Sequence, residues 1–472
     1  MRTKLRPRLV VTILAATAAL ALSSCIEGPI AGTPTLTLGI DPADVGYTTS
    51  EVFLFDQAQA YLPDAPLTAD GRWSVSPDPD TDEAGFKTRM VVVRPTDPAA
   101  FNGTVYVEWM NVTGGADLPV DWTGAHRNIT RRGAMYVGVS AQAVGVNQLR
   151  SADPTRYGSL VHPGDSYSYD IFSKAAKAIR TDRKVTGGLK PLRMVAMGQS
   201  QSASRLVTYV DAIQPSDHAF DGFLIHGRGS GGSSLSQSPL ASVPVPSPTQ
   251  IRDDLDVPVF VVMAEDDVIR SNTAVRQPDT PLMRTWEMAG TAHLDAYLSR
   301  FSKSDVGDGT GARLLFDEMR SPRAPFAGCA NSQNAGGLTY VLRAAFRAMD
   351  RWLRTGTPPP AGAPLATTST SPTVLQRDEW GNAVGGVRSV QVDVPVAAID
   401  GINSGTGFCI LFGGTRPLTD QQLQARYDSK QDFVDEYAAS LQSLVAQGYL
   451  LQVDANELLS VATQRAATLP LP

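Results

Sequence analysis

Short apolar runs recur along the first two thirds of the chain, and stretches with helical spacing of apolar residues lie between several of them. Runs of about four to eight mostly apolar residues are typical of strands buried on both faces of a sheet. Helical spacing is seen in residues 170–179 and 204–213. The alternation predicts an α/β fold with a mostly parallel central sheet and helices on both faces. The strand-like segments are residues 51–54, 88–94, 105–110, 135–140, 194–197, 222–226, 258–263 and 284–288.

Two compositional breaks divide the chain. Residues 229–250, rich in Ser, Gly and Pro, predict either a cap insertion over the sheet or a disordered excursion. A helix predicted over residues 338–353 is stopped by Gly-Thr-Pro-Pro-Pro at 356–360. We therefore divide the chain into a main domain at 39–355, an exposed linker at 356–373 and a C-terminal extension at 374–472, with helices at 431–447 and 454–467, packed on the main domain.

The segment after the fifth strand-like run predicts a nucleophilic serine. This run ends in Gly198-Gln199-Ser200-Gln201-Ser202, and a helical pattern follows. Strand, sharp turn with a serine, and helix is the pattern of a nucleophile elbow, in which the positions two before and two after the serine must be small. Gly198 and Ser202 meet that demand, although glycine is more usual at the second position. Ser200 is therefore the predicted nucleophile.

An acid and a base follow the serine in the order that this fold uses, namely Ser, Asp or Glu, and His. A later strand ends in Ala264-Glu265-Asp266-Asp267, and His293 follows the next strand. The imidazole takes the serine proton, and the acid orients the imidazole and stabilises its charged form. Counting from Ala264 favours Asp267 as the acid, with Glu265 as the alternative and Asp266 as the least favoured of the three.

Two backbone N–H groups are needed to bind the oxyanion that develops on the substrate carbonyl. One is predicted to be the amide of Gln201, the residue after the nucleophile. The other is expected in the loop Asn111-Val112-Thr113-Gly114-Gly115, from Val112 or Thr113. A simple glycine-rich turn is the alternative interpretation of this loop.

Several segments resemble the signatures of a bacterial alpha/beta-hydrolase domain family with Gly-x-Ser-Gln-Ser-Ala elbows. The two clearest are Gly198-Gln199-Ser200-Gln201-Ser202-Ala203 and Trp286-Glu287-Met288-Ala289-Gly290-Thr291-Ala292-His293. Residues 102–111, 156–165 and 378–388 resemble the family as well, so the likeness extends from about residue 41 to the end of the chain. The resemblance implies the alpha/beta-hydrolase fold and a serine hydrolase, and it names no substrate. A triad supplies every group that the reaction needs, so no cofactor and no metal is expected.

The N-terminus predicts export. Four basic residues (Arg2, Lys4, Arg6 and Arg8) precede the apolar stretch 9–22, which is too short to span a membrane and is typical of a signal peptide. It ends in Leu22-Ser23-Ser24-Cys25, which resembles a lipobox. We expect residues 1–24 to be removed, Cys25 to be lipidated and residues 25–38 to form a tether. An ordinary secretory cleavage site beside an incidental cysteine is the alternative.

The cysteine content agrees with export, and the net charge bears only on the choice of partner. Of three cysteines, Cys329 and Cys409 remain after Cys25, and an oxidising compartment favours a disulfide between them; two buried thiols are the alternative. No Cys/His spacing resembles a zinc site. The chain carries 47 acidic and 41 basic residues; loss of the four leader cations leaves 37 basic residues, a net charge of about −10. Nucleic acid is therefore an unsuitable partner.

The sequence thus predicts an exported, lipid-anchored serine hydrolase of the cell envelope that cleaves a small-molecule carboxylic ester. Residues 39–355 form its catalytic domain, with Ser200, Asp267 and His293 as the triad. An amidase or peptidase with the same triad is one alternative, and a catalytically silent binding lipoprotein on the same scaffold is the other. The residues specify neither acyl nor alcohol preference, and they leave the oligomeric state undetermined.

Overall fold

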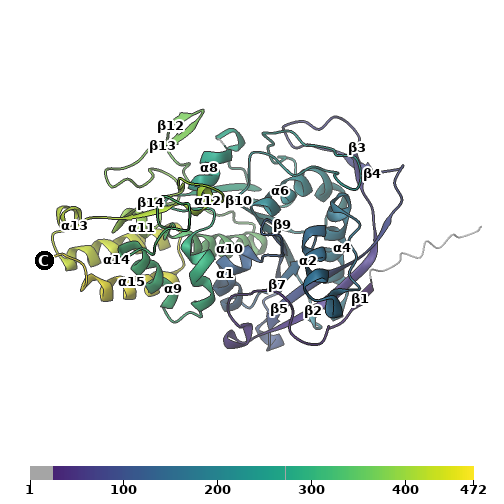
Figure 1. Ribbon diagram of the computed structural model, residues 1–472, viewed down its shortest axis with the longest axis horizontal. Helices are drawn as coiled ribbons and strands as arrows, with labels where there is room; N and C mark the ends of the chain where they lie inside the picture. Colours follow the sequence, from purple (N-terminus) through teal and green to yellow (C-terminus); the bar gives the residue numbers. More distant parts are fainter. Residues whose placement is uncertain (1–24, 272) are drawn as a thin grey trace, which may run out of the picture.

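A nine-stranded sheet runs through the centre of the computed structural model, which describes residues 25–271 and 273–472 (Figure 1). All eight predicted strands are present in it. The six strands from β7 to β11 in spatial order run parallel, whereas β1, β2 and β5 are added antiparallel at one end. In spatial order the strands are β1 (Cys25–Glu27), β2 (Tyr47–Ala58), β5 (Ala84–Pro95), β7 (Met135–Val139), β6 (Thr104–Trp109), β8 (Arg193–Gln199), β9 (Gly222–His226), β10 (Val259–Ala264) and β11 (Met283–Met288).

Five of the six parallel strands are buried almost throughout, which explains their continuous apolar runs, whereas the first three residues of the edge strand β11 are partly exposed. Along β6, Val105 and Val107 belong to the core on one face, whereas Tyr106 belongs to the core on the other. Helices α4 (Ser168–Thr181) and α6 (Gln201–Thr208) cover the first face. Helices α1 (Val120–Arg131) and α10 (Leu338–Thr355) cover the second face. The fold class is therefore α/β, as predicted.

The two long helices of the C-terminal extension join the core on the second face of the sheet. Helices α14 (Lys430–Gln447) and α15 (Gln452–Ala466) lie beside α9 (Thr310–Arg320) at the end of the molecule that carries the C-terminus (Figure 1). Their side chains Phe433, Leu441 and Leu458 join the same core cluster as α1 and α10. The sheet and the extension therefore share one hydrophobic core.

The stretch 356–373, predicted as an exposed linker, is held along β11 in its first half. The indole N–H of Trp286 donates to the carbonyl of Pro360 at 2.9 Å, and the amide of Leu365 donates to Glu287 Oε2 at 2.8 Å. Beyond this point the chain forms a small hairpin of β12 (Thr367–Thr370) and β13 (Thr373–Leu375). The segment thus connects the two parts of the chain while it covers the edge of the sheet.

The expected signal peptide, residues 1–24, lies outside the described residues. The expected tether, residues 25–38, lies against the body of the protein. Its first three residues form β1, in which Cys25 pairs with Phe55 of β2 and Ile26 is buried. Farther along, the amide of Thr35 donates to the hydroxyl of Tyr157 at 2.8 Å. Within residues 25–271 and 273–472, none of the helices combines the length and the apolar character needed to cross a membrane.

Residues 229–250 form an irregular loop that packs against α4 and α6. A single β-bridge joins Ser236 to Val243, and the hydroxyl of Tyr169 in α4 donates to the carbonyl of Ser234 at 2.9 Å. The side chain of Gln237 donates to Asp165 Oδ2 at 3.0 Å. The segment is thus anchored on the helical layer beside the carboxyl ends of the parallel strands. Of the two predictions for this segment, a cap insertion describes it better than a disordered excursion.

Candidate active site

Ser200 occupies a strained turn between β8 and α6. Its φ of 64° and ψ of −117° are unusual for a residue with a side chain, and such a conformation costs roughly 1–3 kcal/mol. Two hydrogen bonds hold it: the Ser200 amide donates to the His226 carbonyl at 2.9 Å, and the Ser204 amide donates to the Ser200 carbonyl at 3.1 Å. A Cβ at Gly198 would lie 3.0 Å from the Cβ of Ser202. The close approach of these two positions explains why both are small.

Asp267 and His293 form a buried acid–base pair. Nδ1 of His293 lies 2.6 Å from Oδ1 of Asp267, and the other carboxylate oxygen accepts the amide of Ala264 at 2.8 Å. Burial alone would raise the pKa of Asp267, but His293 and Arg270 outweigh it and hold the pKa of this carboxyl below its usual value. An N–H on Nδ1 therefore points at a carboxylate, which leaves Nε2 as the basic nitrogen.

Glu265, the alternative acid, is used elsewhere. Its carboxylate accepts the amide of Gly290 at 2.5 Å and the amide of Gly401 at 3.0 Å, and it lies 2.9 Å from Nη1 of Arg377. Burial raises the pKa of Glu265, and these three partners oppose the rise in part. Glu265 thus ties the end of β10 to the C-terminal extension, while Asp267 is the carboxylate that contacts the imidazole of His293.

Asp266 and Arg270 are neighbours of the pair that the sequence did not assign. Oδ1 of Asp266 accepts the backbone amide of His293 at 2.8 Å, and burial together with the charge of Asp267 raises the pKa of Asp266 well above its usual value. Nη2 of Arg270 lies 3.2 Å from Asp267 Oδ1 and 3.4 Å from His293 Nδ1. In the sequence, Arg270 could have been linked to Asp267 only by its position three residues later, which in a helix puts the two side chains on one face.

These groups could also be considered as metal ligands. One ligand atom each from Asp266, Asp267 and His293 lies within 4.8 Å of the others. Arg270 already places a positive charge 3.2 Å from Asp267. Each of the three side chains also has a protein hydrogen-bond partner, so the arrangement is explained by an acid–base pair with its supporting groups.

Gly227 shows how closely the three predicted residues converge. It follows His226, whose carbonyl binds the Ser200 amide, and it has a φ of 63°. A Cβ at Gly227 would lie 3.1 Å from Oδ2 of Asp267 and 3.2 Å from Nδ1 of His293. The end of β9 therefore contacts Ser200 through the carbonyl of His226 and lies against the acid–base pair at Gly227.

The predicted oxyanion donors differ in what they bind. Gln201 is the first residue of α6, and the first amides of a helix have no partner within it. The amide of Thr113, by contrast, donates to Oδ1 of Asn111 at 2.8 Å. The prediction of Thr113 as a donor is therefore wrong, because its N–H is already used inside the loop. No hydrogen bond among the described residues uses the amide of Val112, which leaves Val112 as the candidate from this loop.

His226 ends β9 on the same edge as these residues, yet its side chain is turned to a different partner. Its Nδ1 lies 2.8 Å from Oδ1 of Asp121, at the start of α1, and both side chains are buried. This satisfied pair agrees with a structural role for the His226 imidazole.

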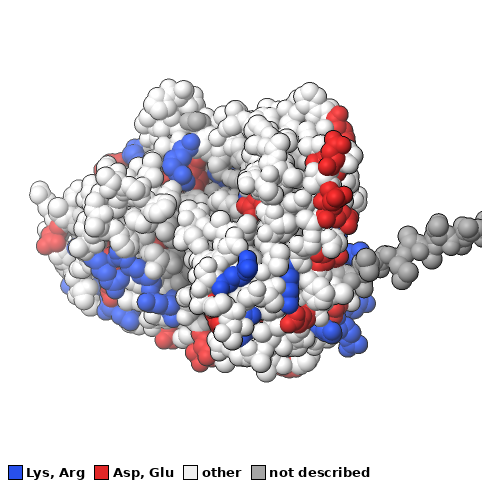
Figure 2. Space-filling view, turned by 45° about the vertical axis from the view of Figure 1, so that its right-hand side comes forward, with Lys and Arg blue, Asp and Glu red and all other residues white. Residues whose placement is uncertain are grey.

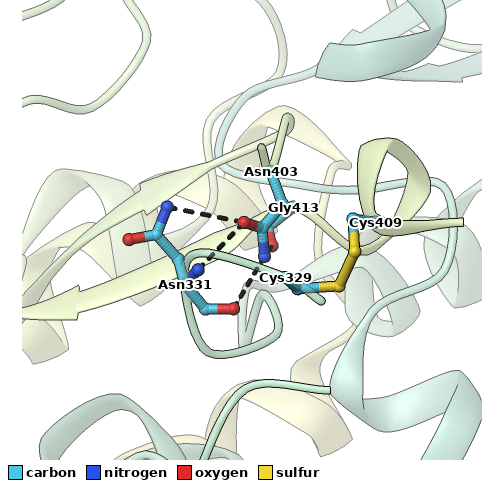
Figure 3. Close-up of a disulfide and its surroundings, with 5 residues drawn as sticks. All are labelled: Cys329, Asn331, Asn403, Cys409 and Gly413. Carbon is cyan, nitrogen blue, oxygen red and sulfur yellow. Dashed lines mark hydrogen bonds between the residues drawn. A yellow bond between two sulfur atoms is a disulfide. The ribbon is translucent and has the colours of Figure 1, made fainter. Parts of the chain in front are cut away.

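A disulfide joins Cys329 and Cys409, as predicted, with the two Cα atoms 5.3 Å apart. Figure 3 shows it beside the side chain of Asn403, which donates to the carbonyl of Asn331 at 2.7 Å and to that of Gly413 at 2.8 Å. The disulfide and these bonds hold together two loops that are about 80 residues apart in the chain.

Both of these loops also bind the segment that follows His293. The amide of Leu294 donates to the carbonyl of Leu411 at 2.9 Å, and the amide of Ala296 donates to the carbonyl of Asn334 at 2.8 Å. The disulfide-linked loops thus support the histidine from the C-terminal side.

Comparisons with known proteins give one match over most of the chain, to a family model, and weak matches to solved structures. A search of curated proteins finds no significant match. Among solved structures, similarity is found to esterase Est22 (14% identity, 59% of this chain and 83% of that chain, TM-score 0.32). It is also found to a serine hydrolase without lid from Xanthomonas campestris (14% identity, 54% and 94%, TM-score 0.29) and to a glucuronoyl esterase from Solibacter usitatus (12% identity, 64% and 88%, TM-score 0.30).

Such low similarities add nothing to the assignment of the site. The family model described as an alpha/beta hydrolase domain is more informative, because it matches residues 19–460. This match covers most of the chain, including the C-terminal extension as far as residue 460, and it spans all nine strands of the central sheet. The chain belongs to the alpha/beta hydrolase domain family.

Proposed function

We propose that the protein is a serine hydrolase that cleaves a small-molecule carboxylic ester through Ser200, Asp267 and His293. The observations that carry the proposal are the 2.6 Å pair of Asp267 and His293 and a serine at φ 64° whose amide binds the carbonyl of His226, the residue before Gly227. A serine in an elbow and a histidine oriented by a buried carboxylate are the parts that acyl transfer requires. No cofactor or metal enters this chemistry.

The reaction follows from the proposed roles. Nε2 of His293 takes the proton of Ser200 as Oγ attacks the ester carbonyl carbon, and Asp267 stabilises the imidazolium. The amides of Gln201 and Val112 bind the oxyanion of the tetrahedral intermediate. The imidazolium then gives its proton to the leaving alcohol, and an acyl-enzyme remains on Ser200. Water, deprotonated by His293, releases the acid and restores the serine.

Steady-state kinetics with short-chain p-nitrophenyl esters test this proposal. Ser200→Ala and His293→Ala should each lower kcat by about 10⁴–10⁶ without loss of folding, in the range seen when a triad member is removed. Ser230→Ala, in the loop after β9, is the matched control and should keep the wild-type rate. Equal rates in Ser200→Ala and Ser230→Ala would contradict the assignment.

Amidase activity and silent binding remain the competing functions. Matched p-nitrophenyl ester and p-nitroanilide substrates with the same acyl group separate esterase from amidase, because an amidase cleaves both, whereas we expect this protein to cleave the ester and to leave the anilide intact. A folded wild-type protein that turns over neither substrate, but binds the ester, would favour the silent scaffold.

We also propose that the protein is an exported lipoprotein anchored through Cys25. Cys25 begins β1 and pairs with Phe55, so a lipid on this residue would hold the edge of the sheet close to the bilayer. Incorporation of labelled palmitate in cells tests the proposal: the wild type should carry the label and Cys25→Ser should not. Label in Cys25→Ser, or none in the wild type, would contradict lipidation.

Surface charge supports a small-molecule substrate and not a nucleic acid. In Figure 2, acidic side chains gather along one edge of the face shown, and basic and acidic side chains are interspersed over its lower part. The mature chain would also be acidic overall.

A further inference from the structure

Two buried side-chain amides join the three loops of the proposed active site. Asn111 begins the loop that carries Val112, and Gln199 is the residue before Ser200. Each of the two side chains is only 4% exposed. We propose that Asn111 and Gln199 are positioning residues that hold the oxyanion loop, the serine and the histidine in one reacting geometry. The inference rests on the proposed function, because it concerns the same site.

Asn111 fixes the peptide group that precedes the serine. Its Nδ2 donates to the carbonyl oxygen of Gln199 at 3.0 Å. The N–H of the same peptide group belongs to Ser200 and donates to the carbonyl of His226 at 2.9 Å. Both ends of the peptide group are therefore bound. Because Ser200 is strained, a peptide group free to rotate would relax the strain and move Oγ out of position.

The other end of the Asn111 side chain orders the oxyanion loop. Its Oδ1 accepts the amide of Thr113 at 2.8 Å. The backbone of Asn111 also exchanges two hydrogen bonds with Leu118, at 3.1 and 2.8 Å. These bonds close the loop around Val112, whose amide is the proposed second oxyanion donor. One side chain thus sets the position of this donor relative to the serine.

Gln199 connects the serine to the histidine. Its Nε2 donates to the backbone carbonyl of His293 at 3.2 Å, while Asp266 accepts the backbone amide of His293 at 2.8 Å. Both backbone polar groups of the histidine are therefore held by side chains, and its imidazole is held by Asp267. The histidine is fixed at three points, one of which comes from the residue next to the nucleophile.

The chemistry of these contacts requires amides and not acids. Asn111 must donate at one end and accept at the other, whereas a carboxylate only accepts. A carboxylate at position 199 would set one acceptor against the carbonyl oxygen of His293. The changes Asn111→Asp and Gln199→Glu are nearly isosteric, so they remove the donation while they keep the size of the side chain. A displacement of about 1 Å in a catalytic group can cost about 10² in rate.

The test compares these variants with a matched control on the opposite edge of the sheet. Gln214 precedes β9, is 1% exposed, and its Nε2 donates to the carbonyl of Phe220 at 2.9 Å, so Gln214→Glu makes the same chemical change away from the site. Ester kcat and KM, the rate of fluorophosphonate labelling and Tm are measured for each protein. Gln199→Glu and Asn111→Asp should lower kcat and the labelling rate about 10–100-fold with KM within about threefold of wild type. Gln214→Glu should keep the wild-type kcat.

Each outcome of these measurements either supports or contradicts the positioning role of Asn111 and Gln199. If Gln199→Glu labels as fast as Gln214→Glu, the positioning role is contradicted, whereas the proposed function is not. A folded wild type that does not label contradicts the proposed function and the inference with it. Where a charged variant does not fold, Gln199→Met and Asn111→Leu remove the same donors without adding charge, and the same loss of kcat at steady KM is expected. Wild-type kcat in these uncharged variants would overturn the inference.

Discussion

The carboxylate of Asp267 lies 2.6 Å from Nδ1 of His293, whereas the adjacent carboxylate of Asp266 binds the backbone amide of the same histidine at 2.8 Å. Two consecutive acids thus serve one residue in different ways. One orients the imidazole, and the other fixes the backbone that carries it. The contact of Asp267 with the imidazole leads to the first prediction.

Asp267→Asn should lower kcat by about 10⁴, because an amide facing Nδ1 favours the wrong imidazole tautomer, as in other triads. Glu265→Gln should instead act on stability. It removes the charge of a buried carboxylate, while Arg377 is one-quarter exposed and still pairs with Asp400 at 2.6 Å, so the cost should be about 1–3 kcal/mol, and kcat per folded molecule should stay near wild type. Kinetics and urea unfolding of both variants check this. A larger kcat loss in Glu265→Gln than in Asp267→Asn would make Glu265 the catalytic acid.

Gly227→Ala should lower kcat about 10²-fold. Its Cβ would approach Asp267 Oδ2 and His293 Nδ1 to 3.1 and 3.2 Å and push the pair away from the serine. Gly356→Ala is the matched control, because Gly356 has a φ of 70° and no heavy atom within 4 Å of the added Cβ. Both variants carry the strain of a positive φ, so a loss of kcat shared by both would refute the proposed crowding.

The free energy of unfolding should depend on the ionisation of Asp295, which occurs at a higher pH than that of an ordinary carboxyl. Burial raises its pKa to about 7, so the folded state holds a proton that the unfolded state has released between about pH 4 and pH 7. The stability that depends on this proton is complete below about pH 4 and is lost as the pH rises through 7. Asp295→Asn keeps the acceptor for the amide of Leu298 and should remove this loss, by up to about 4 kcal/mol at pH 8.

Chemical denaturation of the wild type and Asp295→Asn at pH 4, 6 and 8 measures the effect. The two proteins should differ most at pH 8. A constant difference across the three pH values would show that Asp295 does not titrate in this way.

Loss of the disulfide should destabilise the protein and loosen the histidine loop. Removal of a disulfide typically costs about 2–5 kcal/mol, and here the linked loops bind Leu294 and Ala296 directly after His293. Cys329→Ser with Cys409→Ser should therefore lower Tm and kcat together. Thiol alkylation before and after reduction, read by mass spectrometry, shows whether the bond is present. Two freely alkylated thiols without reduction would contradict it.

The sheet could be predicted from the sequence, and the proposed triad could be chosen from it, because both rest on local signals. Strand burial appears as apolar runs, and the elbow needs small residues on both sides of Ser200. Asp267 could be chosen by counting from the end of β10. The contacts that complete the site have no such signal: Asn111 binds Gln199 across 88 residues, and Gln199 binds His293 across 94. Only the fold brings these side chains together.

Two other features could not be predicted from the pattern of apolar and polar residues. β1 is three residues long, too short for any periodicity, so its segment was predicted as a tether. Thr113 was predicted as an oxyanion donor because loop composition does not show which amide is already bonded; the side chain of Asn111 decides that.

Fluorophosphonate labelling of the purified protein, with the modified peptide located by mass spectrometry, is the most direct test of Ser200 as the nucleophile. We expect one label on Ser200, slower labelling in His293→Ala and none in Ser200→Ala. A folded wild type that stays unlabelled, or a label on another serine that persists in Ser200→Ala, would contradict it.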